Sequence, residues 1–226
     1  MSREASRLSV VVPVFNEEEN VGPLADAVRV SLSAAPGLAG GWELVLVNDG
    51  STDGTGRAIE RLAAADPRIR LVQLRRHAGQ TAAMMAGFAH ARGDVIATMD
   101  GDLQNDPRDL PAMVAKLDEG FDLVAGWRVR RQDRLWTRKV PSWIANRLIA
   151  RITGIPIRDN GCSLKVYRRA LLERITLYAD MHRFIPAFAA LAGARIAQLP
   201  VRHHARRFGR SKYGLGRTYR VLADLV

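Results

Sequence analysis

The sequence predicts an α/β protein with a Rossmann-like, mostly parallel sheet that is covered by helices on both faces. Through residues 1–127, short apolar runs rich in β-branched residues alternate with segments of helical periodicity. This alternation is the pattern of right-handed βαβ units. The apolar runs are continuous, without alternating polar residues, which is typical of strands buried on both faces. The connecting loops are short, and no internal repeat interrupts the order.

The individual elements follow from the apolar spacing and from the residues that break it. In the first predicted helix, Val21, Leu24 and Val28 recur at helical intervals, and the Gly- and Pro-rich residues 36–41 end it. In this half we expect strands at residues 8–15, 42–47, 69–74, 95–99 and 121–125, and helices at residues 18–32, 55–65, 80–91 and 107–117. Asp106 is the expected cap of the last helix, with Pro107 in its first turn.

The second half differs in composition, but no flexible linker precedes it, so we expect residues 1–226 to form a single domain. Residues 130–151 are basic and amphipathic, with Trp136, Trp143 and Leu148 among the apolar members. We expect short strands at residues 161–167 and 195–203, and helices at residues 181–191 and 213–226. No stretch approaches about 18 consecutive apolar residues, so we expect no transmembrane helix in this chain.

The charge is divided unevenly between the two halves. The chain has a net charge of +11, but residues 1–127 carry 12 Lys and Arg against 18 Asp and Glu, whereas residues 128–226 carry 22 against 5. A basic half of this kind is either an ordinary solvated face or a surface for phosphates, anionic lipid or nucleic acid. The single cysteine, Cys162, excludes an internal disulfide framework and fits a reducing compartment.

Polar motifs directly follow four of the predicted strands. They are Asn16-Glu17, Asn48-Asp49, Asp100-Gly101-Asp102 and Trp127-Arg128. Ligands bind beyond the carboxyl ends of the strands in sheets of this class. The four motifs therefore converge on one edge, and this convergence is the main physical reason to expect a site there.

The Asp100-Gly101-Asp102 motif has the composition of a divalent metal site. Two hard carboxylates one residue apart can hold Mg²⁺ or Mn²⁺ when diphosphate oxygens and water complete the shell. The metal would then neutralise charge on a leaving diphosphate. Taken alone, two aspartates in a surface turn before a helix are an equally good interpretation. The motif that follows the second strand is similarly open, because Ser51 or Asp53 can simply cap the next helix.

Taken in order, the motifs resemble family 2 glycosyltransferases. The residues that carry the resemblance are Val11-Val12-Pro13-Val14-Phe15-Asn16-Glu17-Glu18, Val47-Asn48-Asp49-Gly50-Ser51-Thr52-Asp53 and Met99-Asp100-Gly101-Asp102-Leu103-Gln104. Residues 159–168 and 206–213 look like the polyprenyl-phosphate branch, which includes dolichol-phosphate mannosyltransferase and the bacterial undecaprenyl-phosphate glycosyltransferases. The resemblance covers roughly residues 8–222 and implies the GT-A fold. The Gln-x-x-Arg-Trp motif of processive synthases is missing, which argues against polymerisation.

The resemblance implies a nucleotide-sugar half at residues 1–127 and an acceptor- and membrane-facing half at residues 128–226. Asp49 would contact the base. The positions that match donor-binding residues are Pro13, Asn16, Glu17, Asp49, Asp100, Arg206, Ser211 and Lys212, the last three in a loop that closes over the diphosphate. The positions that match metal ligands are Asp100, Asp102 and Gln104.

On the acceptor side, Arg128 matches an arginine for the acceptor phosphate, and we expect Arg138 and Lys139 to assist it. Asp159 matches an essential acidic residue near the transferred sugar, so the expected catalytic set is Asp102, Arg128 and Asp159. A phosphate monoester, with a second pKa of about 6, is already largely ionised at neutral pH. Such an acceptor needs cations to position it more than it needs a general base. The resemblance also implies inversion at the anomeric carbon.

The predicted function is transfer of a hexose from a nucleotide diphosphate sugar, of the GDP-mannose or UDP-glucose type, to a polyprenyl phosphate at the cytoplasmic membrane face. Residues 130–151 would lie on an anionic membrane surface, since Trp and cationic residues both favour the headgroup region. Many members of the resembled branch continue into transmembrane helices. We therefore expect either a peripheral protein that relies on surface contact or on a membrane-anchoring partner, or a longer form that carries the anchor itself.

Two alternatives remain open at this stage. One is a soluble family 2 transferase that acts on a glycan or a small molecule, which the basic half disfavours. The other is a nucleic-acid-binding domain that uses the basic half. Because the strand-end motifs are acidic and no nucleic-acid motif occurs, we expect no nucleic-acid partner. The sequence leaves the base, the sugar, the lipid length and the oligomeric state undetermined.

Overall fold

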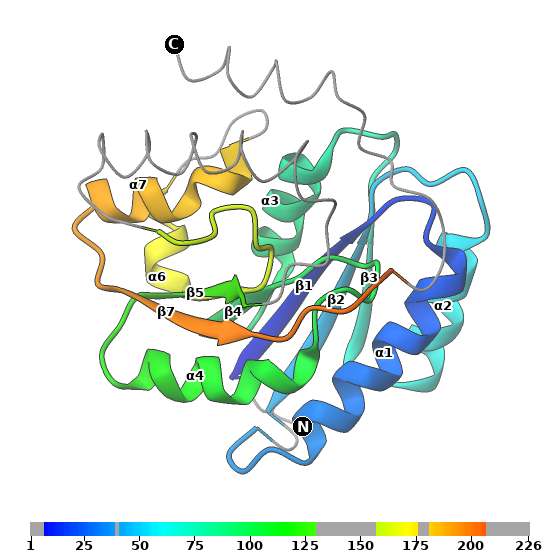
Figure 1. Cartoon of the computed structure of the whole chain (residues 1–226). Helices are drawn as coiled ribbons and strands as arrows, with labels where there is room; N and C mark the ends of the chain where they lie inside the picture. The colour runs from blue at the N-terminus through cyan, green and yellow to red at the C-terminus, as the bar shows by residue number, and fades with distance from the viewer. Residues whose placement is uncertain (1–6, 39–40, 130–156, 176–180, 207–226) are drawn as a thin grey trace.

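The computed structural model describes residues 7–38, 41–129, 157–175 and 181–206, and Figure 1 shows them as a twisted sheet between two layers of helices. Within these residues the sheet has seven strands in the order β3-β2-β1-β4-β6-β5-β7. The strands are β1 (Leu8–Val14), β2 (Trp42–Asn48), β3 (Ile69–Gln73), β4 (Val95–Thr98), β5 (Leu123–Arg128), β6 (Lys165–Arg168) and β7 (Ile196–Val201).

The sheet is mostly parallel, as predicted. β3, β2, β1 and β4 pair in parallel, and β5 pairs in parallel with β7. β6 is antiparallel to both of its neighbours, β4 and β5. The chain thus places a strand from its second half between two strands of its first half. Because β6 runs against its neighbours, the residues that precede it lie at the same edge as the residues that follow β4 and β5.

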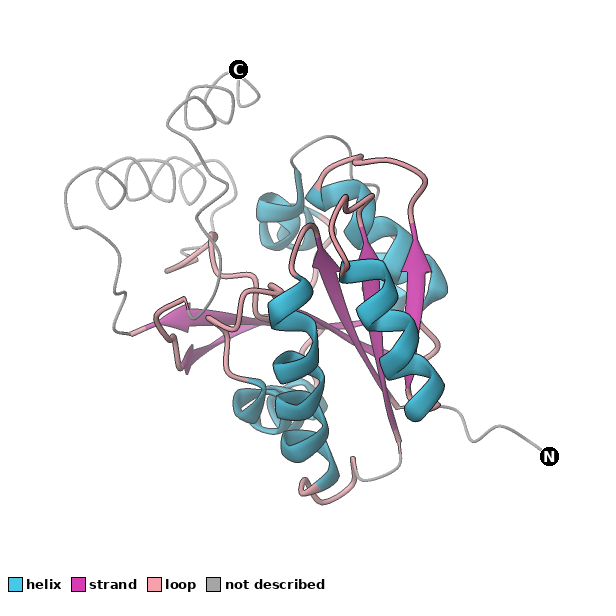
Figure 2. Cartoon of the chain, turned by 90° about the vertical axis from the view of Figure 1, so that its right-hand side faces the viewer, coloured by secondary structure: helices cyan, strands magenta, loops and turns pink. Residues whose placement is uncertain are grey.

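Helices cover both faces, which confirms the second part of the fold prediction (Figure 2). One face carries α1 (Glu18–Ser33), α2 (Thr55–Ala65) and α4 (Leu110–Asp118), and the other carries α3 (Gln80–His90), α6 (Arg169–Leu172) and α7 (Ile185–Leu191). Successive residues of β1 explain the two layers. Val10 and Val12 belong to the core beneath α1, and Val11 belongs to the core beneath α3. Both sides of the strand are apolar because side chains alternate between the faces.

Two predicted helices begin differently from the expectation. The predicted helix at residues 107–117 starts with the 3-10 turn η1 (Pro107–Asp109), and that at residues 181–191 starts with η2 (Met181–Phe184). Asp106 does act as a cap, since its carboxylate accepts a hydrogen bond from the backbone N–H of Arg108. In η1, Pro107 removes a backbone donor and favours a tighter first turn. In the second case the proline, Pro186, lies in the first turn of α7, directly after η2.

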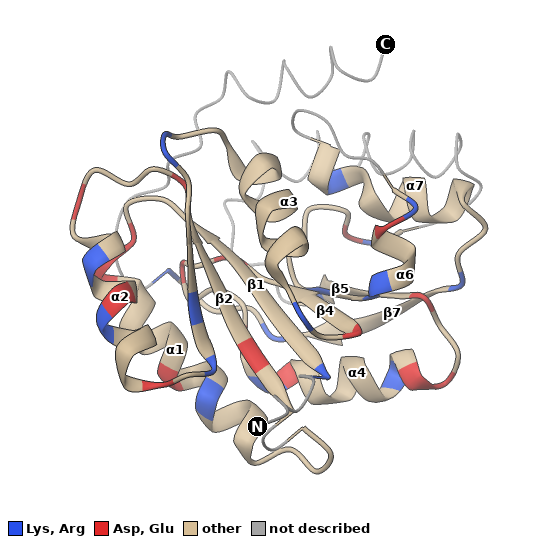
Figure 3. Ribbon diagram, turned by 180° about the vertical axis from the view of Figure 1, so that it is seen from behind, with Lys and Arg blue, Asp and Glu red and all other residues tan. Residues whose placement is uncertain are grey.

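The two signs of charge are mixed over the helices in the view of Figure 3, where α2 carries both acidic and basic residues. Of the 22 Lys and Arg in residues 128–226, 12 fall in residues 130–156 and 207–226, which lie outside the described residues. The amphipathic segment at residues 130–151 and the final helix at residues 213–226 therefore stay predictions. Among the described residues, no helix has both the length and the apolar character needed to cross a bilayer.

Candidate active site

The loops after β1 and β2 interlock at the carboxyl ends of the strands. Asn16 accepts a hydrogen bond from the backbone N–H of Thr52 at 2.8 Å, and its own N–H donates to the Ser51 hydroxyl at 2.9 Å. Asn16 has a φ of 51°, a left-handed conformation that asparagine adopts more readily than most residues. The N–H of Glu17 donates to the hydroxyl of Thr55 at 2.9 Å. Two of the predicted strand-end motifs thus form one rigid corner.

Asp49 is buried and holds the start of α3. Its two carboxylate oxygens accept hydrogen bonds from the backbone N–H groups of Ala78 and Gly79, at 2.7 and 3.0 Å. A carboxylate at this place also suits the positive end of the helix dipole. His77 lies 2.8 Å from the same carboxylate and stacks on Phe15, with ring centroids 4.1 Å apart. Asp49 therefore fixes the loop between β3 and α3. Its expected contact with a base stays a prediction.

Asp100 and Asp102 lie in the loop after β4, as predicted. The side-chain amide of Gln80 donates to Asp100 at 2.9 Å, and the backbone N–H of Asp100 donates to Asn105 at 3.1 Å. Asp102 accepts from the backbone N–H of Gln104 at 3.1 Å and from the guanidinium of Arg206 at 2.6 Å. Asp102 and Arg206 are 104 residues apart in the sequence, so the start of the predicted closing loop lies on the predicted metal loop.

The electrostatics of this loop favour a cation. Burial raises the pKa of Asp102 to about 6, and the neighbouring charge of Asp100 acts in the same direction. Arg206 partly opposes this shift and is already a positive charge on the carboxylate. Within the described residues, no group of three or more His, Cys, Asp or Glu could hold a metal. Asp100 and Asp102 are oxygen donors of the kind that Mg²⁺ and Mn²⁺ take, so the residues fit such an ion if a ligand supplies further oxygens.

The last described segment lies along this loop. His204 donates its backbone N–H to the Gln104 carbonyl at 2.9 Å, and its ring lies 2.9 Å from Asp106. The amide group of Gln104 in turn donates to the His204 carbonyl at 3.3 Å. The metal-binding role expected for Gln104 stays a prediction, and its amide is turned towards His204 in this structure. Pro13 lies beside Asp100 in the wall of a small cavity.

Arg128 and Asp159 meet at the same side of the sheet. The guanidinium donates to both carboxylate oxygens, at 2.7 and 2.9 Å, and the backbone N–H of Arg128 adds a contact at 3.3 Å. The side chains are 11% and 10% exposed. The sequence predicts separate roles for these two residues, and the structure pairs them. Ser211, Lys212, Arg138 and Lys139 lie outside the described residues, so their placement stays a prediction.

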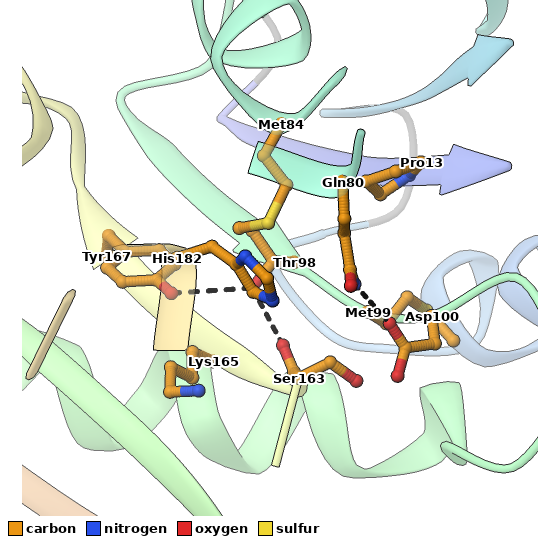
Figure 4. Close-up of a pocket in the computed structure, with 10 residues that line it drawn as sticks. All are labelled: Pro13, Gln80, Met84, Thr98, Met99, Asp100, Ser163, Lys165, Tyr167 and His182. Carbon is orange, nitrogen blue, oxygen red and sulfur yellow. Dashed lines mark hydrogen bonds between the residues drawn. The ribbon is translucent and has the colours of Figure 1, made fainter. Parts of the chain in front are cut away.

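Two residues of the site are missing from the sequence prediction. Gln80 reaches Asp100 from the start of α3, and Lys165 lies buried on β6, 3% exposed. Both line a cavity behind Asp100, which Figure 4 shows with the Gln80–Asp100 hydrogen bond. The sequence does contain a signal for Gln80, because this polar residue lies at the end of the loop that follows the third predicted strand. For Lys165, the signal is a lysine inside the apolar run of residues 162–167.

The chain is similar in sequence to one protein family and to several of its characterised members. Residues 9–176 match the sequence model of the family described as glycosyl transferase family 2. A dodecaprenyl-phosphate galacturonate synthase of Rhizobium johnstonii is 51% identical over 227 residues, which cover 99% of this chain and 66% of the relative. An undecaprenyl-phosphate 4-deoxy-4-formamido-L-arabinose transferase of Salmonella choleraesuis is 42% identical over 221 residues, which cover 97% of this chain and 66% of the relative. The chain thus spans 66% of the length of these relatives.

Solved structures give the same picture of the fold. A glucosyl-3-phosphoglycerate synthase from Mycobacterium tuberculosis, in complex with Mn²⁺, UDP-glucose and phosphoglyceric acid, aligns with a TM-score of 0.73 and 25% identity, covering 97% of this chain and 78% of the other. A mannosyltransferase from Pyrobaculum calidifontis, in complex with GDP-mannose and Mn²⁺, aligns with a TM-score of 0.66 and 22% identity, covering 91% of this chain and 58% of the other. These likenesses confirm the fold expected from the sequence.

Proposed function

The chain belongs to glycosyl transferase family 2, and from this premise we propose that it transfers a glycosyl group from a nucleoside diphosphate sugar to a polyprenyl phosphate. The observation that carries the proposal is the convergence of carboxylates and guanidinium groups at one edge of the sheet. Asp100 and Asp102 present carboxylates at the end of β4, and Arg128 presents a guanidinium at the end of β5. A metal-bound diphosphate suits the first group, and an acceptor phosphate suits the second.

The donor would lie against the corner formed by the loops after β1 and β2. Asp100 and Asp102 would hold a divalent ion, Mg²⁺ or Mn²⁺, with Gln104 as the further predicted ligand. When bound, the ion would supply positive charge to the leaving diphosphate. Arg206 already lies on Asp102 at 2.6 Å, so its guanidinium is close enough to turn to a diphosphate held there. The Mn²⁺ complexes of the structural neighbours support this arrangement.

The acceptor side needs orientation more than proton transfer. The phosphate of a polyprenyl phosphate is largely ionised at neutral pH, with a second pKa of about 6. Arg128 would position it, and the two hydrogen bonds that its guanidinium donates to Asp159 fix the plane of the guanidinium. Asp159 thus orients Arg128 in this scheme and need not abstract a proton. The relatives named for dodecaprenyl- and undecaprenyl-phosphate support the lipid class.

The sugar is a separate question. The sequence favours GDP-mannose or UDP-glucose by analogy, whereas the relative at 51% identity is named for galacturonate. We therefore place a uronic acid donor first, with glucose and mannose donors as alternatives. The site of action would be a membrane surface, because the acceptor is a lipid and residues 130–151 are basic and amphipathic. A soluble family 2 transferase acting on a glycan is the competing assignment.

The test is a transfer assay with sugar-labelled UDP-galacturonate, UDP-glucose and GDP-mannose, each with undecaprenyl phosphate in detergent and Mn²⁺. We expect label from one donor to move into the organic phase. Removal of Mn²⁺ by chelation should abolish the transfer, and Arg128→Met should reduce it. Label that moves only to a water-soluble glycan acceptor would establish the competing assignment, and no transfer from any donor would refute the proposed reaction for this panel.

A further inference from the structure

Lys165 is a buried basic residue for which the proposed reaction has no direct use. It lies on β6, is 3% exposed, and pairs in register with Thr98 of β4 and Ala125 of β5. Lysine is among the residues least often buried, because its charged form loses hydration in the interior. Burial lowers the pKa of Lys165, and nearby negative groups, among them Asp159 and Asp100, partly oppose that shift. Such an arrangement needs a reason.

The contacts of Lys165 point to the turn that carries Asp159. Its ammonium nitrogen donates to the carbonyl oxygen of Asn160 at 3.3 Å and to the carbonyl oxygen of Cys162. The backbone N–H of Cys162 closes the turn by donating to the carbonyl of Asp159 at 3.2 Å. A side chain from the interior of the sheet thus binds two carbonyls of one loop, those of Asn160 and Cys162. These bonds fix the backbone immediately after Asp159.

The other end of this loop is tied to the predicted metal loop. The hydroxyl of Ser163 donates to Asn105 at 2.8 Å, and Asn105 also accepts the backbone N–H of Asp100 at 3.1 Å. Thr98 donates to the carbonyl of Ser163 at 2.8 Å, a contact that Figure 4 shows beside Lys165. Residues 159–165 therefore connect the Arg128–Asp159 pair to the loop of Asp100.

We propose that Lys165 is a positioning residue that holds the turn of residues 159–162, and through it Asp159 and Arg128, at a fixed place relative to Asp100. The inference rests on the proposed function, since it assigns the acceptor-side pair its position relative to the donor side. Gly161 is consistent with a tightly held turn. A Cβ added there would lie 3.3 Å from the Arg128 guanidinium and 3.5 Å from the Asp159 carboxylate. The backbone of the turn therefore packs closely against the guanidinium.

Lys165→Met tests the proposal, because methionine fills a similar volume and removes both hydrogen bonds. We expect kcat for transfer from UDP-galacturonate to undecaprenyl phosphate to fall about tenfold to a hundredfold, since misplacement by about 1 Å costs that much. Binding of UDP with Mn²⁺ should change by less than about twofold. The melting temperature should fall by no more than a few degrees, because relief of the buried ammonium's lost hydration offsets part of what its two hydrogen bonds contribute. Exchange of the Cys162 amide hydrogen should accelerate by about tenfold.

Two further variants separate positioning from general stability. Lys165→Arg keeps hydrogen-bond donors at this position. The side chain lines a cavity of about 20 Å³, which offers space for part of the larger guanidinium, so we expect partial recovery of kcat. Glu43→Gln removes another buried charge, 2% exposed and at the opposite end of the sheet, and should leave kcat unchanged. A Lys165→Met protein with normal kcat and normal Cys162 exchange would overturn the proposal. Parallel loss of melting temperature, UDP binding and kcat would also overturn it, in favour of a purely structural role.

The proposed reaction and the positioning role of Lys165 can be refuted independently of each other. Absence of transfer by the wild-type chain with every donor refutes the reaction, while the exchange rate of the Cys162 amide still decides whether Lys165 holds the turn. Unchanged exchange in Lys165→Met then refutes the positioning role, and accelerated exchange confined to residues 159–163 supports it.

Discussion

The guanidinium of Arg128 and the carboxylate of Asp159 form a two-point ion pair at 2.7 and 2.9 Å, and both side chains are about nine-tenths buried. The pair joins the end of β5 to the turn before β6. Burial makes the partners interdependent, because either one alone would leave a charge in a place that water hardly reaches. Several expected outcomes follow from this pair and from its neighbours.

Removal of both partners should cost less than the sum of the two single removals. We expect Arg128→Met and Asp159→Asn each to lower the free energy of unfolding by about 3 kcal/mol or more, because each strands a buried partner. The double variant should lose clearly less than the sum of the two, with a coupling energy of about 1–3 kcal/mol. Urea unfolding of the four proteins measures this cycle. Strictly additive losses would show that the two side chains do not support each other in solution.

Asp102 should destabilise the metal-free protein at neutral pH. Burial and Asp100 raise its pKa to about 6, so the folded chain binds this proton more tightly than the unfolded chain does. The stability it contributes is fully present below its ordinary pKa of 3.8 and is lost as pH rises through about 6. At pH 7.5 without metal, Asp102→Asn should therefore be more stable than wild type, on the order of 1–3 kcal/mol.

The control for Asp102→Asn is the same comparison at lower pH and with metal. At about pH 5 the advantage of the variant should shrink, since Asp102 is then mostly protonated in the folded wild type. Excess Mn²⁺ with UDP at pH 7.5 should raise the melting temperature of wild type and leave the variant unchanged. A variant that melts lower than wild type in all conditions contradicts this account of the carboxylate.

Arg206 should compete with the metal for Asp102. Without nucleotide, Arg206→Met should bind Mn²⁺ about fivefold more tightly, because an ion pair of roughly 1 kcal/mol no longer has to be broken. With UDP present the sign should reverse, since the predicted diphosphate contact is lost. Arg202→Met is the matched control, because Arg202 pairs with Asp109 at 2.9 Å and not with Asp102. Equal Mn²⁺ affinities for wild type and Arg206→Met without UDP would exclude competition.

Gly50 should tolerate no side chain. It has a φ of 66°, and an added Cβ would lie 2.4 Å from the backbone of Arg76 and His77. Gly50→Ala should therefore lower the melting temperature and weaken UDP binding, because the loop held by Asp49 has to move. Gly22→Ala in α1 has nothing within 4 Å and should stabilise by about 0.5–1 kcal/mol. Thermal melts and UDP titration of both variants check this, and normal UDP binding by a folded Gly50→Ala would contradict it.

The basic half should bind anionic membranes. We expect the chain to sediment with vesicles of phosphatidylglycerol and phosphatidylcholine at low salt, and to be released at high salt. Arg138→Glu with Lys139→Glu should weaken this binding by about tenfold or more, since each cation contributes about 1 kcal/mol. The control is Arg57→Glu with Arg61→Glu, two exposed residues on α2. Equal binding by both double variants would place the membrane contact elsewhere.

Local sequence patterns predicted most of the fold and only part of the site. The buried strands and their polar ends could be read from apolar runs, because each depends on residues close in the chain. The insertion of β6 between β4 and β5 could not, since strand pairing over such distances has no local signal. The same holds for Arg128 with Asp159 and for Asp102 with Arg206. Family resemblance selected these residues singly, and only the folded chain shows which of them meet.

The Arg128–Asp159 pair also has a consequence for how the chain can vary. The chain leaves the sheet after Arg128 and re-enters it at Lys165, and Asp159 in the turn before β6 binds the side chain of Arg128. The residues between Arg128 and Asp159 thus begin and end at the edge of the sheet that carries the candidate site, where the ion pair joins their two ends. We expect a change in the length or sequence of residues 130–156 to leave the Arg128–Asp159 pair and the strands beside it in place.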